Sequence, residues 1–299
     1  MPRRPTASIA EFPVSGKDAG PYGITCGPDG ALWFTMVHHG RIGRVTPEGD
    51  VTSYPLQPAS TGPSTITTGP DDALWFTEFR AHRIGRVTTA GEVESFVLPT
   101  PDAGPFGIAT GPDDALWFTE AGADRIGRIT TSGQITEFPL PLSGAFPSAI
   151  AAGPDDRLWF TMNQANAIGA IGPGGDITVH PLPTPAAAPV GITAGADDAL
   201  WFVEIGAGQI GRITPDGKID EFALPDRSAR PHAITTDTGG NCWFTEWGAN
   251  RIGRITPDGR IDEYDLPSPS SEPHGITQGP GGTIWTVQEI GTIARLTPH

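Results

Sequence analysis

The chain contains 299 residues and carries a net charge of −15, with 34 acidic against 19 basic side chains. This excess of acid disfavours binding to a phosphate backbone, so nucleic acid is not an expected partner. No apolar run is long enough to span a bilayer, and the basic N-terminal stretch lacks the apolar segment of a secretory signal. We therefore expect a soluble, cytoplasmic protein that makes no membrane contact.

One tryptophan recurs every 42 residues along the chain, with no insertion or deletion. The seven residues are Trp33, Trp75, Trp117, Trp159, Trp201, Trp243 and Trp285. A constant spacing of this kind indicates one structural unit repeated around an axis. Because seven units fill almost the whole length, we expect a single domain over residues 1–299, with these tryptophans packed between neighbouring units.

The unit is clearest in the third copy, where four short runs are rich in Ile, Trp, Phe and Thr. They cover residues 107–110, 115–120, 125–130 and 134–140. A Gly-Pro-Asp-Asp turn separates the first run from the second, and a Thr-Ser-Gly turn separates the third from the fourth. No segment shows a sustained helical period. The repeat therefore predicts an all-β fold, a seven-bladed β-propeller with four antiparallel strands in each blade.

The last unit ends at the C-terminus without a fourth strand. Residues 9–14 near the N-terminus match the fourth run of the third unit, residues 135–140. We therefore expect the N-terminal strand to complete the last blade and close the ring. Closure removes exposed strand edges, so a monomer is expected.

Polar residues that recur in most units are expected to be structural. They are the glutamates that end the second strand, such as Glu78, and the arginines of a repeated R-I-G-R run. The two cysteines, Cys26 and Cys242, lie in strand-like runs of different units, and we expect both to be reduced and buried.

A proline precedes the position at which the chain enters the first strand of each unit, and the residue at this entry position varies around the ring. In order, these residues are Tyr22, Ser64, Phe106, Ser148, Val190, His232 and His274. The repeated proline predicts the same backbone in all seven units, so only the side chain varies. His232, His274 and Tyr22 belong to blades six, seven and one, which are neighbours in a closed ring.

Two acidic residues break the repeat in the last unit. Glu272 lies two residues before His274, and in an extended segment residues i and i+2 point to the same side. Glu289 is the only acid at its position, which follows the end of the second strand. We expect both carboxylates to face the same surface as His274, although each residue taken alone fits a solvated loop. His38 and His39 in the matching loop of blade one are expected to be exposed bystanders.

Two carboxylates on an open surface suit a hard divalent cation such as Mg²⁺, which keeps several waters and takes few protein ligands. A nearby histidine suits proton transfer. The residues leave open whether a metal-activated water attacks the substrate or a proton is removed next to a carbonyl, and Zn²⁺ is a further possible ion. The sequence holds no G-x-S-x-G elbow or phosphate-binding glycine loop, so serine and nucleotide chemistry lack support.

The segment Glu272-Pro273-His274-Gly275-Ile276, followed by Glu289, resembles the virginiamycin B lyase family of streptogramin B lyases. Pro231-His232 and Pro21-Tyr22 extend the resemblance, which covers all seven repeats. It implies a carbon–oxygen lyase that linearises type B streptogramin antibiotics, which are cyclic depsipeptides, by eliminative cleavage of the threonyl ester bond, and so gives antibiotic resistance.

The resemblance also implies roles for individual residues. His274 would be the catalytic base or acid, Glu272 and Glu289 would bind Mg²⁺, and His232 and Tyr22 would contact the substrate. Trp247 and Phe106 could cover apolar parts of a large cyclic peptide. Two alternatives remain: a non-catalytic propeller that binds peptide or protein on the same face, and a metal-dependent lactone or ester hydrolase.

Overall fold

The computed structural model describes residues 7–14, 16 and 18–298. The single domain expected over residues 1–299 thus includes residues 1–6, 15, 17 and 299, which lie outside the described residues, as does the basic start of the N-terminal stretch. No helix in the described part of the chain is long and apolar enough to cross a membrane.

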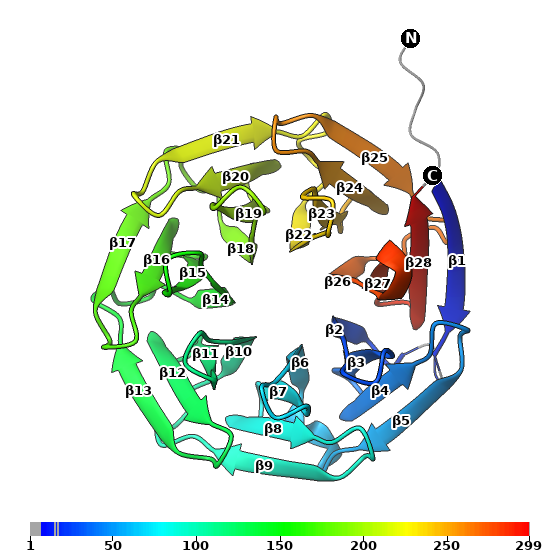
Figure 1. Cartoon of the computed structure of the whole chain (residues 1–299), viewed down its shortest axis with the longest axis horizontal. Helices are drawn as coiled ribbons and strands as arrows, with labels where there is room; N and C mark the ends of the chain where they lie inside the picture. Colours follow the sequence, from blue (N-terminus) through cyan, green and yellow to red (C-terminus); the bar gives the residue numbers. More distant parts are fainter. Residues whose placement is uncertain (1–6, 15, 17, 299) are drawn as a thin grey trace.

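Seven four-stranded antiparallel sheets form a closed ring, as the repeat predicts (Figure 1). The innermost strands are β2 (Pro21–Cys26), β6 (Pro63–Thr68), β10 (Pro105–Thr110), β14 (Pro147–Ala152), β18 (Pro189–Ala194), β22 (Pro231–Thr236) and β26 (Pro273–Gln278). The second strands are β3 (Leu32–Met36), β7 (Leu74–Glu78), β11 (Ala115–Glu120), β15 (Leu158–Met162), β19 (Leu200–Glu204), β23 (Cys242–Glu246) and β27 (Ile284–Gln288).

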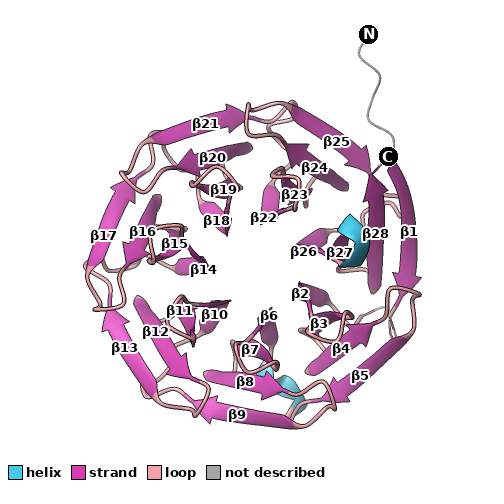
Figure 2. Cartoon of the chain, viewed as in Figure 1, coloured by secondary structure: helices cyan, strands magenta, loops and turns pink. Residues whose placement is uncertain are grey.

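The third strands are β4 (Arg41–Val45), β8 (Arg83–Val87), β12 (Arg125–Thr130), β16 (Ala167–Ile171), β20 (Gln209–Ile213), β24 (Arg251–Ile255) and β28 (Thr292–Pro298). The outermost strands are β5 (Val51–Pro55), β9 (Val93–Val97), β13 (Ile135–Pro139), β17 (Ile177–Pro181), β21 (Ile219–Ala223), β25 (Ile261–Asp265) and β1 (Ala7–Pro13). Two short 3₁₀ turns, Ala59–Thr61 and Pro280–Gly282, are the only helical segments in the described part (Figure 2).

The N-terminal strand completes the last blade. β1 pairs antiparallel with β28, in a register that runs from Ala7 opposite Pro298 to Pro13 opposite Thr292. The prediction of closure by the N-terminal strand is confirmed, and blade seven consists of β26, β27, β28 and β1.

The seven repeated tryptophans are buried between blades, as predicted. Trp33, for example, is fully buried among Leu56, Ile66 and Phe76, and Ile66 and Phe76 belong to the next blade. Each tryptophan also stacks on a ring from the outermost strand of its own blade, at 5.4–5.6 Å between ring centroids. The packing of one blade against the next is therefore repeated around the ring.

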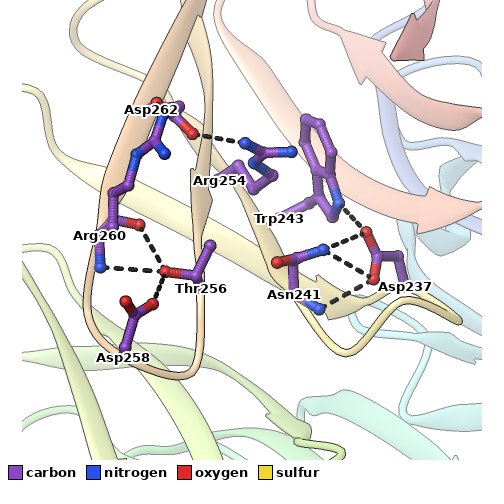
Figure 3. A network of polar contacts seen from close by, with 8 residues as sticks. All are labelled: Asp237, Asn241, Trp243, Arg254, Thr256, Asp258, Arg260 and Asp262. Carbon is purple, nitrogen blue, oxygen red and sulfur yellow. Dashed lines mark hydrogen bonds and ion pairs between the residues drawn. The ribbon is translucent and has the colours of Figure 1, made fainter. Parts of the chain in front are cut away.

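The repeated arginines belong to this packing. In blade six, Arg254 lies 5.6 Å from the ring centroid of Trp243 and donates to Asp262 at 2.5 Å (Figure 3). Trp243 Nε1 donates to Asp237 Oδ2 at 2.7 Å, and Asn241 donates to the same carboxylate. Asp262 thus holds the arginine over the tryptophan ring, so the structural role expected for the R-I-G-R arginines is confirmed here. Both cysteines are free; Cys242 is buried as expected, but Cys26 is only half-buried.

Candidate active site

The three residues predicted from the first strands meet near the ring axis, where β22, β26 and β2 are neighbours (Figure 1). The ring centroids of His274 and His232 are 4.9 Å apart, and those of His274 and Tyr22 are 4.7 Å apart. Tyr22 Oη lies 3.3 Å from His232 Nε2. The residues selected because they depart from the repeat therefore form one cluster, which spans blades six, seven and one.

Glu289 provides the carboxylate of this cluster. One carboxylate oxygen, Oε2, lies 2.5 Å from His274 Nε2, and the other, Oε1, lies 3.3 Å from His38 Nε2. Partial burial raises the pKa of Glu289, but hydrogen bonds from His274 and then His38 outweigh this effect and lower the pKa overall. An ionised carboxylate only accepts hydrogen bonds, so both Nε2 atoms act as donors.

Hydrogen bonding assigns different roles to the two nitrogens of His274. Nε2 contacts Glu289, whose side chain lines the neighbouring cavities, whereas Nδ1 is buried and has no hydrogen-bond partner among the described residues. Nε2 is therefore the nitrogen on the side from which a substrate can approach.

His232 and Tyr22 stay uncharged. His232 is partly buried, and burial, followed by the proximity of His274, lowers its pKa to about 3. Burial, followed by the charge of Glu289, raises the pKa of Tyr22 far above its ordinary value. Both residues can thus exchange hydrogen bonds with a bound molecule without changing charge near neutral pH.

Glu272 lies close to the cluster, but not in the way the sequence predicted. Its φ is +50°, and the equivalent residue of every other blade also has a positive φ, so the segment is left-handed at this position rather than extended. The i, i+2 argument is therefore wrong here, and the carboxylate beside His274 is Glu289. The Glu272 side chain is exposed, while its backbone oxygen accepts from the Glu289 amide at 3.2 Å.

Two cavities adjoin the cluster through Glu289, and a third lies next to one of them. Glu272 and Glu289 line a polar cavity of about 450 Å³ together with Asp18, His38 and Ser270. A more apolar cavity of about 320 Å³ lies beyond Glu289 and is bounded by aromatic residues, among them Tyr22, Phe79, Phe106 and Phe146. A third, of about 430 Å³, shares Glu272 and Ser270 with the polar cavity and contains Trp247, which lies 5.5 Å from the guanidinium of Arg230.

The two carboxylates suit a weakly held Mg²⁺ better than a tightly enclosed ion. Both line one open cavity with room for water, which matches the few-ligand coordination of Mg²⁺. No cluster of three or more His, Cys, Asp or Glu side chains able to hold a metal occurs among residues 7–14, 16 and 18–298. A closed, fully protein-ligated zinc centre is therefore not formed by the described residues.

His38 is the site residue that the sequence comparison did not select. Its contact with Glu289 joins blade one to blade seven across 251 positions of sequence. A loop histidine two residues after the second strand gives no indication of such a contact. The sequence contained only an indirect sign of this contact. The blade-one equivalent of Glu272 is Gly20, whose missing side chain leaves space beside the loop that carries His38.

The fold and this cluster define the chain as a closed seven-bladed β-propeller with an imidazole–carboxylate site where its last and first blades meet. A family model described as the virginiamycin B lyase family matches residues 7–296. The chain belongs to this family, which confirms the resemblance seen in the sequence.

Individual relatives agree with this assignment. Curated virginiamycin B lyases from Saccharopolyspora erythraea and Streptomyces coelicolor are 61% identical over 50 residues and 58% identical over 43 residues. These alignments span only 17% and 14% of either protein's length.

Solved structures match over the whole propeller. The virginiamycin B lyase from Staphylococcus aureus has 48% identity and a TM-score of 0.94, covering 98% of this chain and 99% of that one. A structure described as a streptogramin B lyase has 44% identity and a TM-score of 0.95, covering 98% of both chains. A catalytically inactive histidine-to-alanine variant of the S. aureus enzyme, solved with quinupristin, has 47% identity and a TM-score of 0.94, covering 98% of this chain and 99% of that one.

Proposed function

We propose that this protein is a lyase that linearises type B streptogramin antibiotics by eliminative cleavage of the threonyl ester bond, and that it thereby gives antibiotic resistance. The observation that carries the proposal is the His274–Glu289 pair, which lies between an apolar and a polar cavity. The quinupristin complex of the S. aureus relative, at 47% identity, supports the same substrate class.

Elimination requires removal of a proton from the threonine Cα. The electron pair of that C–H bond forms a Cα=Cβ double bond, the Cβ–O bond breaks, and the ester leaves as a carboxylate. We assign the proton transfer to His274 Nε2, which contacts the Glu289 side chain beside the polar cavity. Nε2 carries the hydrogen that it donates to Glu289 in this structure, so it can act as the base only in the tautomer with its hydrogen on Nδ1. The Glu289 carboxylate then accepts a hydrogen bond from Nε2 once the Cα proton has been transferred to it, which is the geometry seen here.

The other site residues have distinct proposed roles. Neutral His232 and Tyr22 would hold polar groups of the cyclic peptide. Phe106 and Trp247, which line two different cavities, would contact its apolar parts. Glu272 and Glu289 would hold Mg²⁺, which would supply positive charge to the carbonyl oxygen as the Cα proton leaves.

Mass spectrometry tests the proposal. The protein is incubated with a type B streptogramin, with and without EDTA, and the product is analysed for mass and for ring opening. Elimination opens the ring at constant mass, and we expect EDTA to stop it and added Mg²⁺ to restore it. A product heavier by one water would identify a hydrolase instead. An unchanged, still cyclic antibiotic would favour a non-catalytic binding propeller. We further propose that the enzyme acts as a cytoplasmic monomer.

A further inference from the structure

We propose that His38 is a positioning residue that holds the Glu289 carboxylate against His274 across the junction of blades seven and one. His38 Nε2 contacts Glu289 Oε1 at 3.3 Å, while Oε2 of the same carboxylate contacts His274 Nε2. A carboxylate held at one oxygen can still rotate about its terminal bond. A second contact at the other oxygen removes that freedom.

The simpler alternative is an exposed pair of little consequence. The side chains of His38 and Glu289 are 44% and 38% exposed, and exposed ion pairs contribute little to stability. This alternative does not account for the location of the pair. His38 lines both the apolar and the polar cavity, so its ring lies between the two spaces beside Glu289. A role in geometry rather than stability fits this location.

The sequence of blade one makes room for the His38 ring. A Cβ placed on Gly20 would lie 2.4 Å from His38 Cδ2 and 2.8 Å from its Nε2. In blade two the equivalent pair repeats the arrangement, since a Cβ on Gly62 would lie 2.9 Å from Arg80 Cγ. In blade six the order is reversed, with the large residue Arg230 opposite the small residue Gly248. In each of these blades, one of the two facing loop positions carries a glycine and the other a large side chain. In blade one the large side chain is the imidazole of His38.

The kinetic part of the test rests on the proposed function. We expect His38→Ala to lower kcat by about tenfold, within the range known for catalytic groups misplaced by about 1 Å. KM should change much less, because the proposed substrate-contacting residues are untouched. His38→Gln keeps an N–H donor for Glu289 and should restore most of kcat. His39→Ala, in the same loop, is the matched control, and its kinetics should equal those of the wild type.

Gly20→Ala tests the same contact from the other side. The new methyl group has to displace the His38 ring, whereas an alanine with positive φ is already tolerated at the equivalent position in blade five, Ala188 (φ +51°). If Gly20→Ala acts through His38, the double variant with His38→Ala will be no slower than His38→Ala alone. Independent, additive losses would contradict the proposal.

Crystal structures of the wild type and of His38→Ala provide a readout that does not depend on turnover. We expect Glu289 to leave His274 Nε2, or to occupy several rotamers, once His38 is gone. A single unchanged Glu289 rotamer in contact with His274 would overturn the proposal, as would unchanged kinetics of His38→Ala. If the wild type leaves streptogramins intact, the proposed function fails, while the crystal structures still decide the role of His38.

Discussion

At the scale of single residues, His274 is the group whose loss should affect chemistry most and folding least. We predict that His274→Ala lowers turnover of a type B streptogramin by at least ~10²-fold, the usual contribution of a proton-transfer group. Its side chain is mostly buried, but it contacts rings and a carboxylate at the channel rim rather than the blade cores. The melting temperature should therefore stay close to that of the wild type, as measured by circular dichroism. Turnover within a few-fold of wild type would remove His274 from its assigned role.

The buried carboxyl group of Glu120 should make the stability of the fold depend on pH. It is fully buried at the end of β11, and both of its carboxyl oxygens lack a hydrogen-bond donor. Burial, followed by the nearby Glu137 carboxylate, raises the pKa of Glu120 to about 8. Because the folded state holds this proton more tightly than the unfolded chain does, its stabilising effect is complete below about pH 4.5 and disappears as the pH rises through about 8.

Glu120→Gln should remove this dependence. In blade seven the equivalent residue is Gln288, whose Nε2 donates at 3.2 Å to Glu11, the counterpart of Glu137. The variant should therefore be more stable than the wild type above pH 8, by roughly 1–3 kcal/mol, the usual cost of an unpaired buried polar group. The difference should shrink towards pH 5, as measured by chemical denaturation at both pH values. A difference that does not change with pH would contradict the assignment.

The limits of prediction from sequence are also visible at single residues. The strict repeat provided an internal reference, so His274, His232, Tyr22 and Glu289 could be selected because they depart from it. The orientation of Glu272 depends on a positive φ that the sequence indicates only through glycine at three of the seven equivalent positions. His38 was not selected because its partner lies in another blade, and spacing within one unit contains no information about contacts between blades.

At the scale of elements, the repeat predicted the four strands of the third unit, but it placed the start of the innermost strand two residues too late. The third unit was expected to begin at residue 107, whereas β10 begins at Pro105, opposite Glu120. The register shifts between Pro105 and Ile108, so a bulge interrupts the pairing at the rim. This irregular start, repeated in every blade, lies immediately beside the variable residue that follows the proline. It gives every blade a similar backbone at the start of its innermost strand, on which the side chain after the proline varies.

At the scale of the whole molecule, ring closure and the site share one junction. Phe12 of β1 stacks on Trp285 of blade seven, and a Cβ on Gly49 in blade one would lie 2.5 Å from the Phe12 ring. The N-terminal strand therefore holds blades seven and one together at the rim of the ring. The His38–Glu289 contact crosses the same junction near the ring axis. Loosening the outer contact should consequently disturb the inner one.

Phe138 of blade three provides a matched control for this coupling. It stacks on Trp117 and contacts Gly175 of blade four in the same way, but far from the cluster in the ring (Figure 1). We predict that Phe12→Ala and Phe138→Ala each destabilise the fold by roughly 1–3 kcal/mol, since each removes a half-buried aromatic stack. Only Phe12→Ala should also lower kcat at temperatures well below unfolding, because only that junction positions Glu289. Equal kcat values for the two variants would mean that the inner strands alone hold the site together.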